Sequence, residues 1–182
     1  MSWEALEQVV AAKVLLNAID TSERLRALGI PHALVGGLAV GLHGHPRATQ
    51  DVDFLVGQSA FAKVSPVLVL RDELREVMRV GVVDFIAAIG TDAAFASSLQ
   101  VPDPGEVPLI RVEILVVMKL RAGRLQDIAD IEHLLEAGAD VASILDYLRE
   151  LAPELLARFS TIADTARGPP EPLGEIGRSD PG

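Results

Sequence analysis

The 182-residue sequence predicts an α+β domain in which a small mixed β-sheet with flanking helices precedes a helical C-terminal region. Before residue 113, short apolar runs alternate with Gly and Pro, a pattern typical of strands separated by turns. Beyond it, apolar residues recur at helical spacing, which predicts successive helices. Strands that come early and helices that come late favour an α+β layout over a regular β–α–β series.

The N-terminal part is expected to be helical up to a glycine and proline stop. Apolar residues from 3 to 28 recur at helical spacing and predict one long helix, or two consecutive helices with a break at residues 20–22. Gly29 can adopt the left-handed backbone that ends a helix, and Pro31 cannot continue one. Residues 32–35 then predict a short strand that leads into Gly36 and Gly37.

The middle of the chain predicts short strands, short helices and loops. The expected helices are residues 38–43, 59–64 and 91–99. The expected strands are residues 51–56, 74–80, 81–89 and 109–112, of which 74–80 and 81–89 are joined tightly near Gly81. Residues 44–50 and 101–108 are expected to be loops.

The C-terminal part predicts helices that are separated by Gly123, Gly138 and Pro153. They cover residues 113–122, 124–136, 140–151 and 153–166. Residues 168–182 are rich in Pro and Gly, and we expect this tail to be disordered. We therefore divide the chain into a core of residues 1–112, a helical region of residues 113–167 and the tail.

The composition limits the classes of partner. The chain carries 16 Lys and Arg against 26 Asp and Glu, a net charge of -10, so its field repels nucleic acid and extensive DNA binding is not expected. It contains no Cys, which excludes disulfides and thiolate metal sites. The sequence has no apolar run of membrane-spanning length and no secretory start, so we expect a cytoplasmic protein with no membrane partner.

Two aspartates in an apolar run carry the strongest chemical signal. Asp51 and Asp53 alternate along a predicted strand, so their side chains point to the same side of the sheet. Mg²⁺ is usually held by a few carboxylates together with substrate phosphates, which makes this pair a candidate site for phosphoryl-group chemistry. The alternative is structural: Asp51 caps the strand and Asp53 pairs with a buried Arg.

Asp84 is a third acid, isolated in the apolar segment VVDFIAA. A buried carboxylate is costly unless it binds a metal, pairs with a cation or accepts hydrogen bonds. If its strand lies beside that of Asp51 and Asp53, three acids converge and can hold one or two Mg²⁺ ions. A structural role in a turn or an ion pair is the alternative for Asp84.

The glycine pair that precedes these acids has a separate role. Gly36 and Gly37 let backbone N–H groups approach a phosphate closely, next to the positive N-terminus of the helix that follows. No Gly-Lys-Ser/Thr follows the pair and the chain has no Gly-x-Gly-x-x-Gly, so this is neither a Walker A loop nor a dinucleotide fingerprint.

Three blocks of the sequence together resemble a known family. They are GG…RATQDVDFLV, GVVDFIAA and VEILVVMKLRAGRLQDIADIEHL, all between residues 32 and 135. Their order is similar to that in the nucleotidyltransferase fold of the DNA polymerase beta superfamily, and most similar to minimal nucleotidyltransferases of bacterial abortive-infection (AbiEii-type) and toxin–antitoxin systems. The resemblance implies that residues 1–112 form the catalytic core and that residues 113–167 complete the cleft.

The resemblance also implies roles for individual residues. It places Gly36 and Gly37 at the triphosphate of an NTP. It makes Asp51, Asp53 and Asp84 the metal ligands, with Asp84 as a candidate general base.

The last of the three blocks contributes a lysine and an acid. Lys119 matches the family's phosphate-facing lysine, and Asp127 matches an acid often needed for activity. From the sequence alone, Lys119 is equally compatible with a surface lysine whose head extends to solvent. Arg124, Asp127 and Asp130 share one helical face, and for Asp130 we expect ordinary intrahelical ion pairs.

The spacer before Asp51 is somewhat longer than in many members of that family. Within it, Arg47 and Thr49 are candidates to reach a phosphate or a base, with loop solvation as the alternative. His43 and His45 lie two residues apart, but no second cluster of soft ligands supports a metal site there, so we expect a polar loop.

The functional prediction is a metal-dependent nucleotidyltransferase that binds Mg²⁺ and transfers NMP from an NTP, such as ATP, to a hydroxyl acceptor. One hypothesis for the acceptor is tRNA or a protein, modified by a toxin-like enzyme with a possible cognate antitoxin. A second is an antibiotic of the aminoglycoside type, because an acidic cleft suits a cationic substrate. A third is a non-catalytic module that keeps the fold and binds a protein or a nucleotide.

Overall fold

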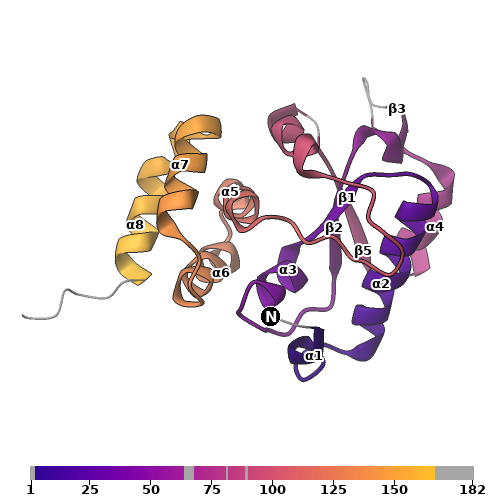
Figure 1. The fold of residues 1–182 in the computed structure, drawn as a ribbon, viewed down its shortest axis with the longest axis horizontal. Coiled ribbons are helices and arrows are strands. Elements are labelled where there is room, and N and C mark those ends of the chain that lie inside the picture. The colour runs from indigo at the N-terminus through magenta and orange to yellow at the C-terminus, as the bar shows by residue number, and fades with distance from the viewer. Residues whose placement is uncertain (1–2, 64–67, 81, 89, 167–182) are drawn as a thin grey trace, which may run out of the picture.

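The computed structural model describes residues 3–63, 68–80, 82–88 and 90–166 and has the expected α+β architecture. Figure 1 shows the sheet with α2 and α4 on one side and the C-terminal helices α5 to α8 on the other. The helices are α1 (Trp3–Leu6), α2 (Ala12–Ala27), α3 (Gly36–Leu42), α4 (Asp72–Val80), α5 (Val112–Ala122), α6 (Leu125–Glu136), α7 (Val141–Leu151) and α8 (Leu156–Ala166). The 3-10 segments are η1 (Gln58–Ala60), η2 (Gly90–Ser98) and η3 (Pro153–Leu155). The predicted tail lies outside the described residues.

The main sheet is mixed and has the strand order β1-β2-β5. Its strands are β1 (His32–Val35), β2 (Val52–Val56) and β5 (Val83–Ala87). β1 pairs with β2 in antiparallel orientation, and β2 pairs with β5 in parallel orientation. Two short strands, β3 (Phe61–Lys63) and β4 (Val69–Leu70), form a separate antiparallel pair.

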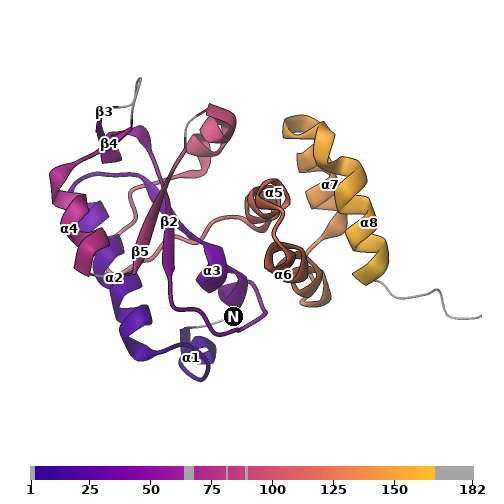
Figure 2. The same ribbon diagram turned by 180° about the vertical axis from the view of Figure 1, so that it is seen from behind.

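Alternation along the central strand β2 divides the core into two clusters. Val52, Phe54 and Val56 pack with residues of α1 and α2, whereas Leu55 packs with the C-terminal helices. Asp53 shares the face of Leu55, because successive strand residues point to opposite faces. The sheet therefore presents its acidic position toward α5 and α6, which lie beside α3 in Figure 2.

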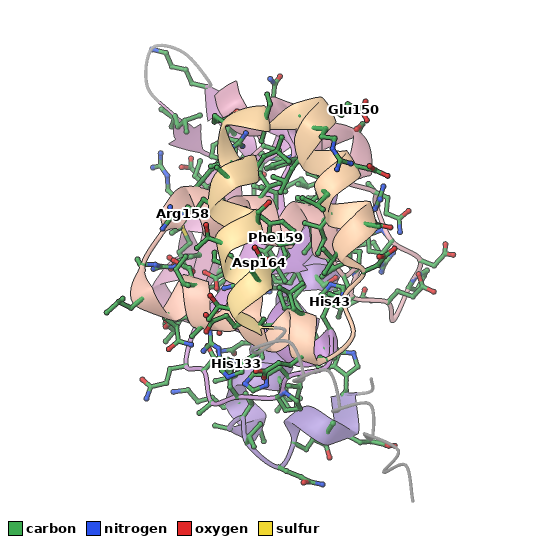
Figure 3. All side chains as sticks on the ribbon, turned by 90° about the vertical axis from the view of Figure 1, so that its left-hand side faces the viewer. His43, His133, Glu150, Arg158, Phe159 and Asp164 are labelled. Atoms are coloured by element: carbon green, nitrogen blue, oxygen red, sulfur yellow. The ribbon has the colours of Figure 1, made fainter. Side chains whose placement is uncertain are left out.

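The C-terminal helices share a core with this face of the sheet. Phe159 of α8 is fully buried in the cluster that also contains β1 and β2 residues. Arg158, labelled with it in Figure 3, donates from Nη1 to the carbonyl oxygen of Leu120 at 2.8 Å. Since Leu120 lies in the last turn of α5, this contact satisfies a carbonyl that the helix leaves unpaired. No helix in the described ranges is both long and apolar enough to cross a bilayer.

Two predicted elements of the middle region are wrong in type. Residues 74–80 belong to helix α4 and not to a strand, because Asp72 and Glu73 favour the first helical turn while Leu74 and Val77 are buried one turn apart. A tight hairpin to the next strand is therefore wrong as well, and β5 joins the sheet parallel to β2. Of the helix predicted at residues 59–64, only 59–60 are helical, as the end of the 3-10 segment η1, whereas 61–63 form strand β3 and residue 64 lies outside the described residues.

Other expectations need smaller corrections. The predicted break at residues 20–22 lies instead between α1 and α2, and α2 continues through Ser22, whose buried hydroxyl contacts His32 Nε2 at 2.8 Å. The predicted strand 109–112 is reduced to a single bridge between Leu109 and Leu34. Of the helix predicted at residues 91–99, residues 91–98 belong to the 3-10 segment η2. Gly29 ends α2 as expected, with φ of +65°.

Candidate functional site

The acids at positions 53 and 84 lie side by side on neighbouring strands. Asp53 and Asp84 are register partners in the parallel β2–β5 ladder, which places their side chains on the same face. Asp51 directly precedes β2 and is exposed, as is Asp84, whereas Asp53 is partly buried. The expected adjacency of the two strands is confirmed. The premise that Asp84 is buried is wrong, since its side chain faces solvent.

The pKa of Asp53 is raised above the ordinary value of an aspartate. Burial is the main cause, and the negative charges of Asp84 and Asp51 add to it. Lys119 and Arg124 act in the opposite direction but do not outweigh these effects. The three acids therefore repel one another, and a bound cation would relieve that repulsion.

Gly36 lies directly against the central acid. It follows β1, has φ of +64°, and a Cβ atom built on it would lie 1.8 Å from Asp53 Oδ2. Only glycine fits here, because any other residue meets both an unfavourable backbone conformation and a clash. The next residue, Gly37, is similarly enclosed, since its Cβ would lie 3.0 Å from Thr49 Oγ1 and 3.1 Å from Arg47 Nη2. The glycine turn thus joins the spacer loop to the three acids Asp51, Asp53 and Asp84, which we call the acid edge.

A cleft of about 400 Å³ separates the acid edge from α5 and the start of α6. Its charged lining comes from both sides and consists of Asp53, Lys119, Arg121, Arg124 and Asp127. The rest of the lining is small or apolar and consists of Val35, Gly36, Ile86, Leu115, Met118 and Ala122. A smaller hollow of about 280 Å³ between α2 and α4 includes none of the predicted site residues.

Lys119 is not a surface lysine. It is 6% exposed, and its Nζ lies 2.6 Å from Asp130 Oδ2 and 3.4 Å from Asp127 Oδ1. An ammonium group has three N–H donors, so these two contacts leave one for another acceptor. Lys119 therefore lines the cleft with a charge that two buried carboxylates already balance.

Asp130 contradicts its predicted role. Instead of intrahelical ion pairs, it accepts hydrogen bonds from Arg47 Nε at 2.8 Å and Nη2 at 2.9 Å, in addition to the contact with Lys119. Gln126 in its own helix donates to it at 2.9 Å. Burial alone would raise the pKa of Asp130, but hydrogen bonds from Arg47, Lys119 and Gln126 outweigh it and lower the pKa. Sequence spacing could not reveal this partner, because Arg47 lies 83 positions away.

Asp127 caps the start of α6. Its carboxylate accepts from the backbone N–H of Arg124 at 3.2 Å and from Arg124 Nε at 2.7 Å. Burial opposes ionisation, but these contacts and the charge of Lys119 lower the pKa of Asp127. The sequence analysis did not predict that Arg121 and Arg124 line the cleft. The available signal was Gly123, which ends α5 between them.

The remaining spacer residues lie near the site without forming a second one. Thr49 Oγ1 donates weakly to the carbonyl oxygen of Asp51 at 3.4 Å. His43 donates from Nε2 to the carbonyl oxygen of Ile110 at 2.7 Å, and the ring of His45 stacks on that of His133 with centroids 3.8 Å apart. Both histidines therefore have packing partners in the fold.

The donor chemistry of the acid edge fits Mg²⁺. All candidate ligands are carboxylate oxygens, and the mutual repulsion at Asp53 is what a cation would remove. Across the described ranges, no three Asp, Glu, His or Cys side chains are already gathered closely enough to hold a metal. Mg²⁺ commonly uses one or two carboxylates and takes its other ligands from phosphate and water, so the pair Asp53 and Asp84 is sufficient as a starting set.

No family model matches this chain, and no curated protein does. Among solved structures, it is similar to an antigenic nucleotidyltransferase-like protein from Paracoccidioides brasiliensis, with a TM-score of 0.42 and 16% identity. That match covers 84% of this chain and 94% of the other. At this level of similarity, the function has to be inferred from the side chains of the cleft.

Proposed function

We propose that this protein is a Mg²⁺-dependent nucleotidyltransferase that transfers NMP from an NTP to a hydroxyl acceptor. The supporting observation is that Asp53 lines a cleft whose opposite wall carries Lys119, Arg121 and Arg124 together with Asp127, and that Asp84 is the register partner of Asp53 on the neighbouring strand. Carboxylates on one wall and cations on the other suit a metal-bound triphosphate, which needs both.

The reaction is an in-line displacement at the α-phosphorus. The acceptor hydroxyl oxygen forms the new bond to phosphorus while its proton passes to a carboxylate oxygen of Asp84. The bond from the α-phosphorus to the bridging oxygen breaks, and pyrophosphate leaves with the electron pair. Asp84 suits the role of base because its side chain is exposed at the edge of the sheet, where an acceptor can reach it.

The other residues bind and orient. Asp51, Asp53 and Asp84 would hold Mg²⁺, which when bound supplies positive charge to the phosphate oxygens. Gly36 and Gly37 would contact the triphosphate through their backbone N–H groups, beside the acids. Across the cleft, Arg124 has a side chain that is 78% exposed, and it offsets triphosphate charge together with the remaining donor of Lys119.

The acceptor is a hydroxyl group of a tRNA or a protein in this proposal, as in toxin-like enzymes of the family that the sequence resembles. Incubation of the protein and MgCl₂ with each labelled NTP and a cell extract tests this. Label on tRNA or protein supports it. Label on an added aminoglycoside instead identifies an antibiotic-modifying enzyme.

The catalytic proposal is tested with Asp53→Asn. This substitution removes one carboxylate charge at nearly constant volume, so we expect transfer to fall to background while the circular dichroism spectrum is unchanged. Asp146→Asn, an exposed acid of α7, is the matched control and retains transfer. Transfer by Asp53→Asn at the wild-type rate would refute the metal-dependent mechanism, and failure of the wild-type to bind any NTP would leave a non-catalytic module.

A further inference from the structure

We infer that Asp130 is a positioning residue that holds the guanidinium of Arg47 against the Gly36-Gly37 turn and so sets the affinity for the NTP triphosphate. The inference deepens the proposed function and rests on it. In this inference, the spacer loop supplies the cation that meets the triphosphate, and α6 supplies the carboxylate that holds this cation in place.

The contacts of Asp130 leave little freedom to Arg47. The two carboxylate oxygens receive Nε and Nη2 of the guanidinium at 2.8 and 2.9 Å, a bidentate arrangement that fixes its plane as well as its distance. Asp130 is 0% exposed and is held by Gln126 and Lys119 in turn. Since the acceptor is buried and is itself held by two other side chains, it fixes the position and the plane of the guanidinium.

The guanidinium so held lies at the glycine turn. Arg47 Nη2 is 3.1 Å from the point where a Cβ of Gly37 would stand, and the Arg47 side chain is still 25% exposed. Nη1 donates to the carbonyl oxygen of Ala48 at 3.2 Å, so each terminal nitrogen retains one N–H for another acceptor. A phosphate at the turn would meet a guanidinium that is already oriented.

The exposure of the cations shows which of them an anion can reach. Lys119 is 6% exposed, whereas the side chains of Arg47 and Arg124 are 25% and 78% exposed. A phosphate can therefore meet both guanidinium groups while each keeps its carboxylate partner, Asp130 for Arg47 and Asp127 for Arg124.

The experiment compares nucleotide binding in Asp130→Asn and wild-type protein by calorimetry with ATP, GTP, CTP and UTP, each with MgCl₂. Asn keeps the shape but loses the charge, so Arg47 is released and NTP affinity falls about tenfold, the loss typical of disturbing a supporting contact. In the transfer assay, KM for the NTP rises by the same factor, while kcat changes less than about threefold.

A second readout follows Arg47 directly. In the wild-type, the Nε–H of Arg47 gives a protected signal in ¹⁵N-detected NMR, and Asp130→Asn removes that protection. Arg47→Gln, at a partly exposed position, covers the case in which Asp130→Asn does not fold, and it lowers NTP affinity about as much. The double variant binds NTP no more weakly than Arg47→Gln, because Asp130 acts on the nucleotide through Arg47. A double variant that is clearly weaker than Arg47→Gln would assign the effect of Asp130 to its other partner, Lys119, and overturn the inference.

Asp140→Ala is the matched structural control. Asp140 caps α7 by accepting from the backbone N–H of Ala142 at 2.9 Å, so its loss lowers stability without changing NTP affinity. If Asp130→Asn folds and binds NTP as tightly as wild-type, or lowers only kcat, the inference is overturned while the proposed function stands. If wild-type protein binds none of the four NTPs, both fail.

Discussion

The aspartates on the two sides of the cleft have pKa values that are shifted in opposite directions. On the sheet side, Asp53 of β2 lies beside Asp84 and near Asp51, and its pKa is raised. Across the cleft, Asp127 and Asp130 are more deeply buried, yet their pKa values are lowered because cations surround them. The buried cluster is electrostatically satisfied and holds α5, α6 and the spacer loop together. The acid edge is not satisfied, which is the condition that a cationic ligand can exploit.

The largest expected loss of stability comes from breaking the buried cluster of Lys119, Asp127 and Asp130. Lys119→Met removes the cation between Asp127 and Asp130 and leaves two buried carboxylates short of positive charge. We expect the free energy of unfolding to fall by about 3–5 kcal/mol in urea denaturation at pH 7.

Arg149→Met is the control for this change, because it breaks an exposed ion pair with Asp146 and costs less than about 1 kcal/mol. A similar cost for both variants would mean that the buried cluster contributes no more than a surface pair.

The glycine turn gives the next effect. Gly36→Ala and Gly29→Ala both place a side chain at positive φ, +64° and +65°, at a cost of about 1–2 kcal/mol each. Only at Gly36 does the new Cβ also clash with Asp53, whereas nothing lies within 4 Å of it at Gly29. We expect Gly36→Ala to lose a further 1–3 kcal/mol or so, and to lose NMP transfer.

The comparison of these two variants isolates the contact with Asp53. Equal stabilities in thermal unfolding, together with retained transfer in Gly36→Ala, would show that the turn can move away from the acid.

Low pH should remove the stabilising contribution of the buried carboxylates Asp127 and Asp130. Asp127 and Asp130 have a pKa below the usual 3.8 in the folded protein, so they bind protons more tightly when unfolded. Their contribution is present above pH 4 or so, and is lost as the pH falls through the lowered pKa values. Unfolding free energy measured between pH 7 and pH 2.5 should drop, and Asp130→Asn should reduce the slope. An unchanged slope in that variant would contradict the assignment.

The smallest expected effect is a gain in stability, and it comes from a substitution at the acid edge. The raised pKa of Asp53 means that its ionised form destabilises the metal-free protein at neutral pH. Asp53→Asn should therefore raise Tm by a few degrees at pH 7 while it abolishes transfer. The gain should vanish as the pH falls below the unfolded-state pKa, where Asp53 is neutral in both states. A lower Tm at pH 7 would show that Asp53 is compensated by a partner.

The errors of sequence reasoning share a cause. Residues 74–80 have apolar positions that fit either a strand or a helix. The burial of Leu74 and Val77, which lie on the same face of α4, decides for the helix. Ser22 has the composition of a helix cap, but its buried hydroxyl contact with His32 keeps it inside α2. In both cases, a distant partner outweighed the local preference.

The sequence alone determined that Asp53 lies in a strand that begins directly after Asp51, that a glycine turn precedes this strand and that helices follow the sheet. These features depend on backbone stereochemistry and on the spacing of apolar residues along the chain, and both are local properties that do not need tertiary contacts. The tertiary structure decided that Asp84 comes alongside Asp53 and that Asp130 holds Arg47. The physical reason is that a carboxylate's partner and its pKa depend on which remote groups approach and exclude water, and no local spacing records that approach.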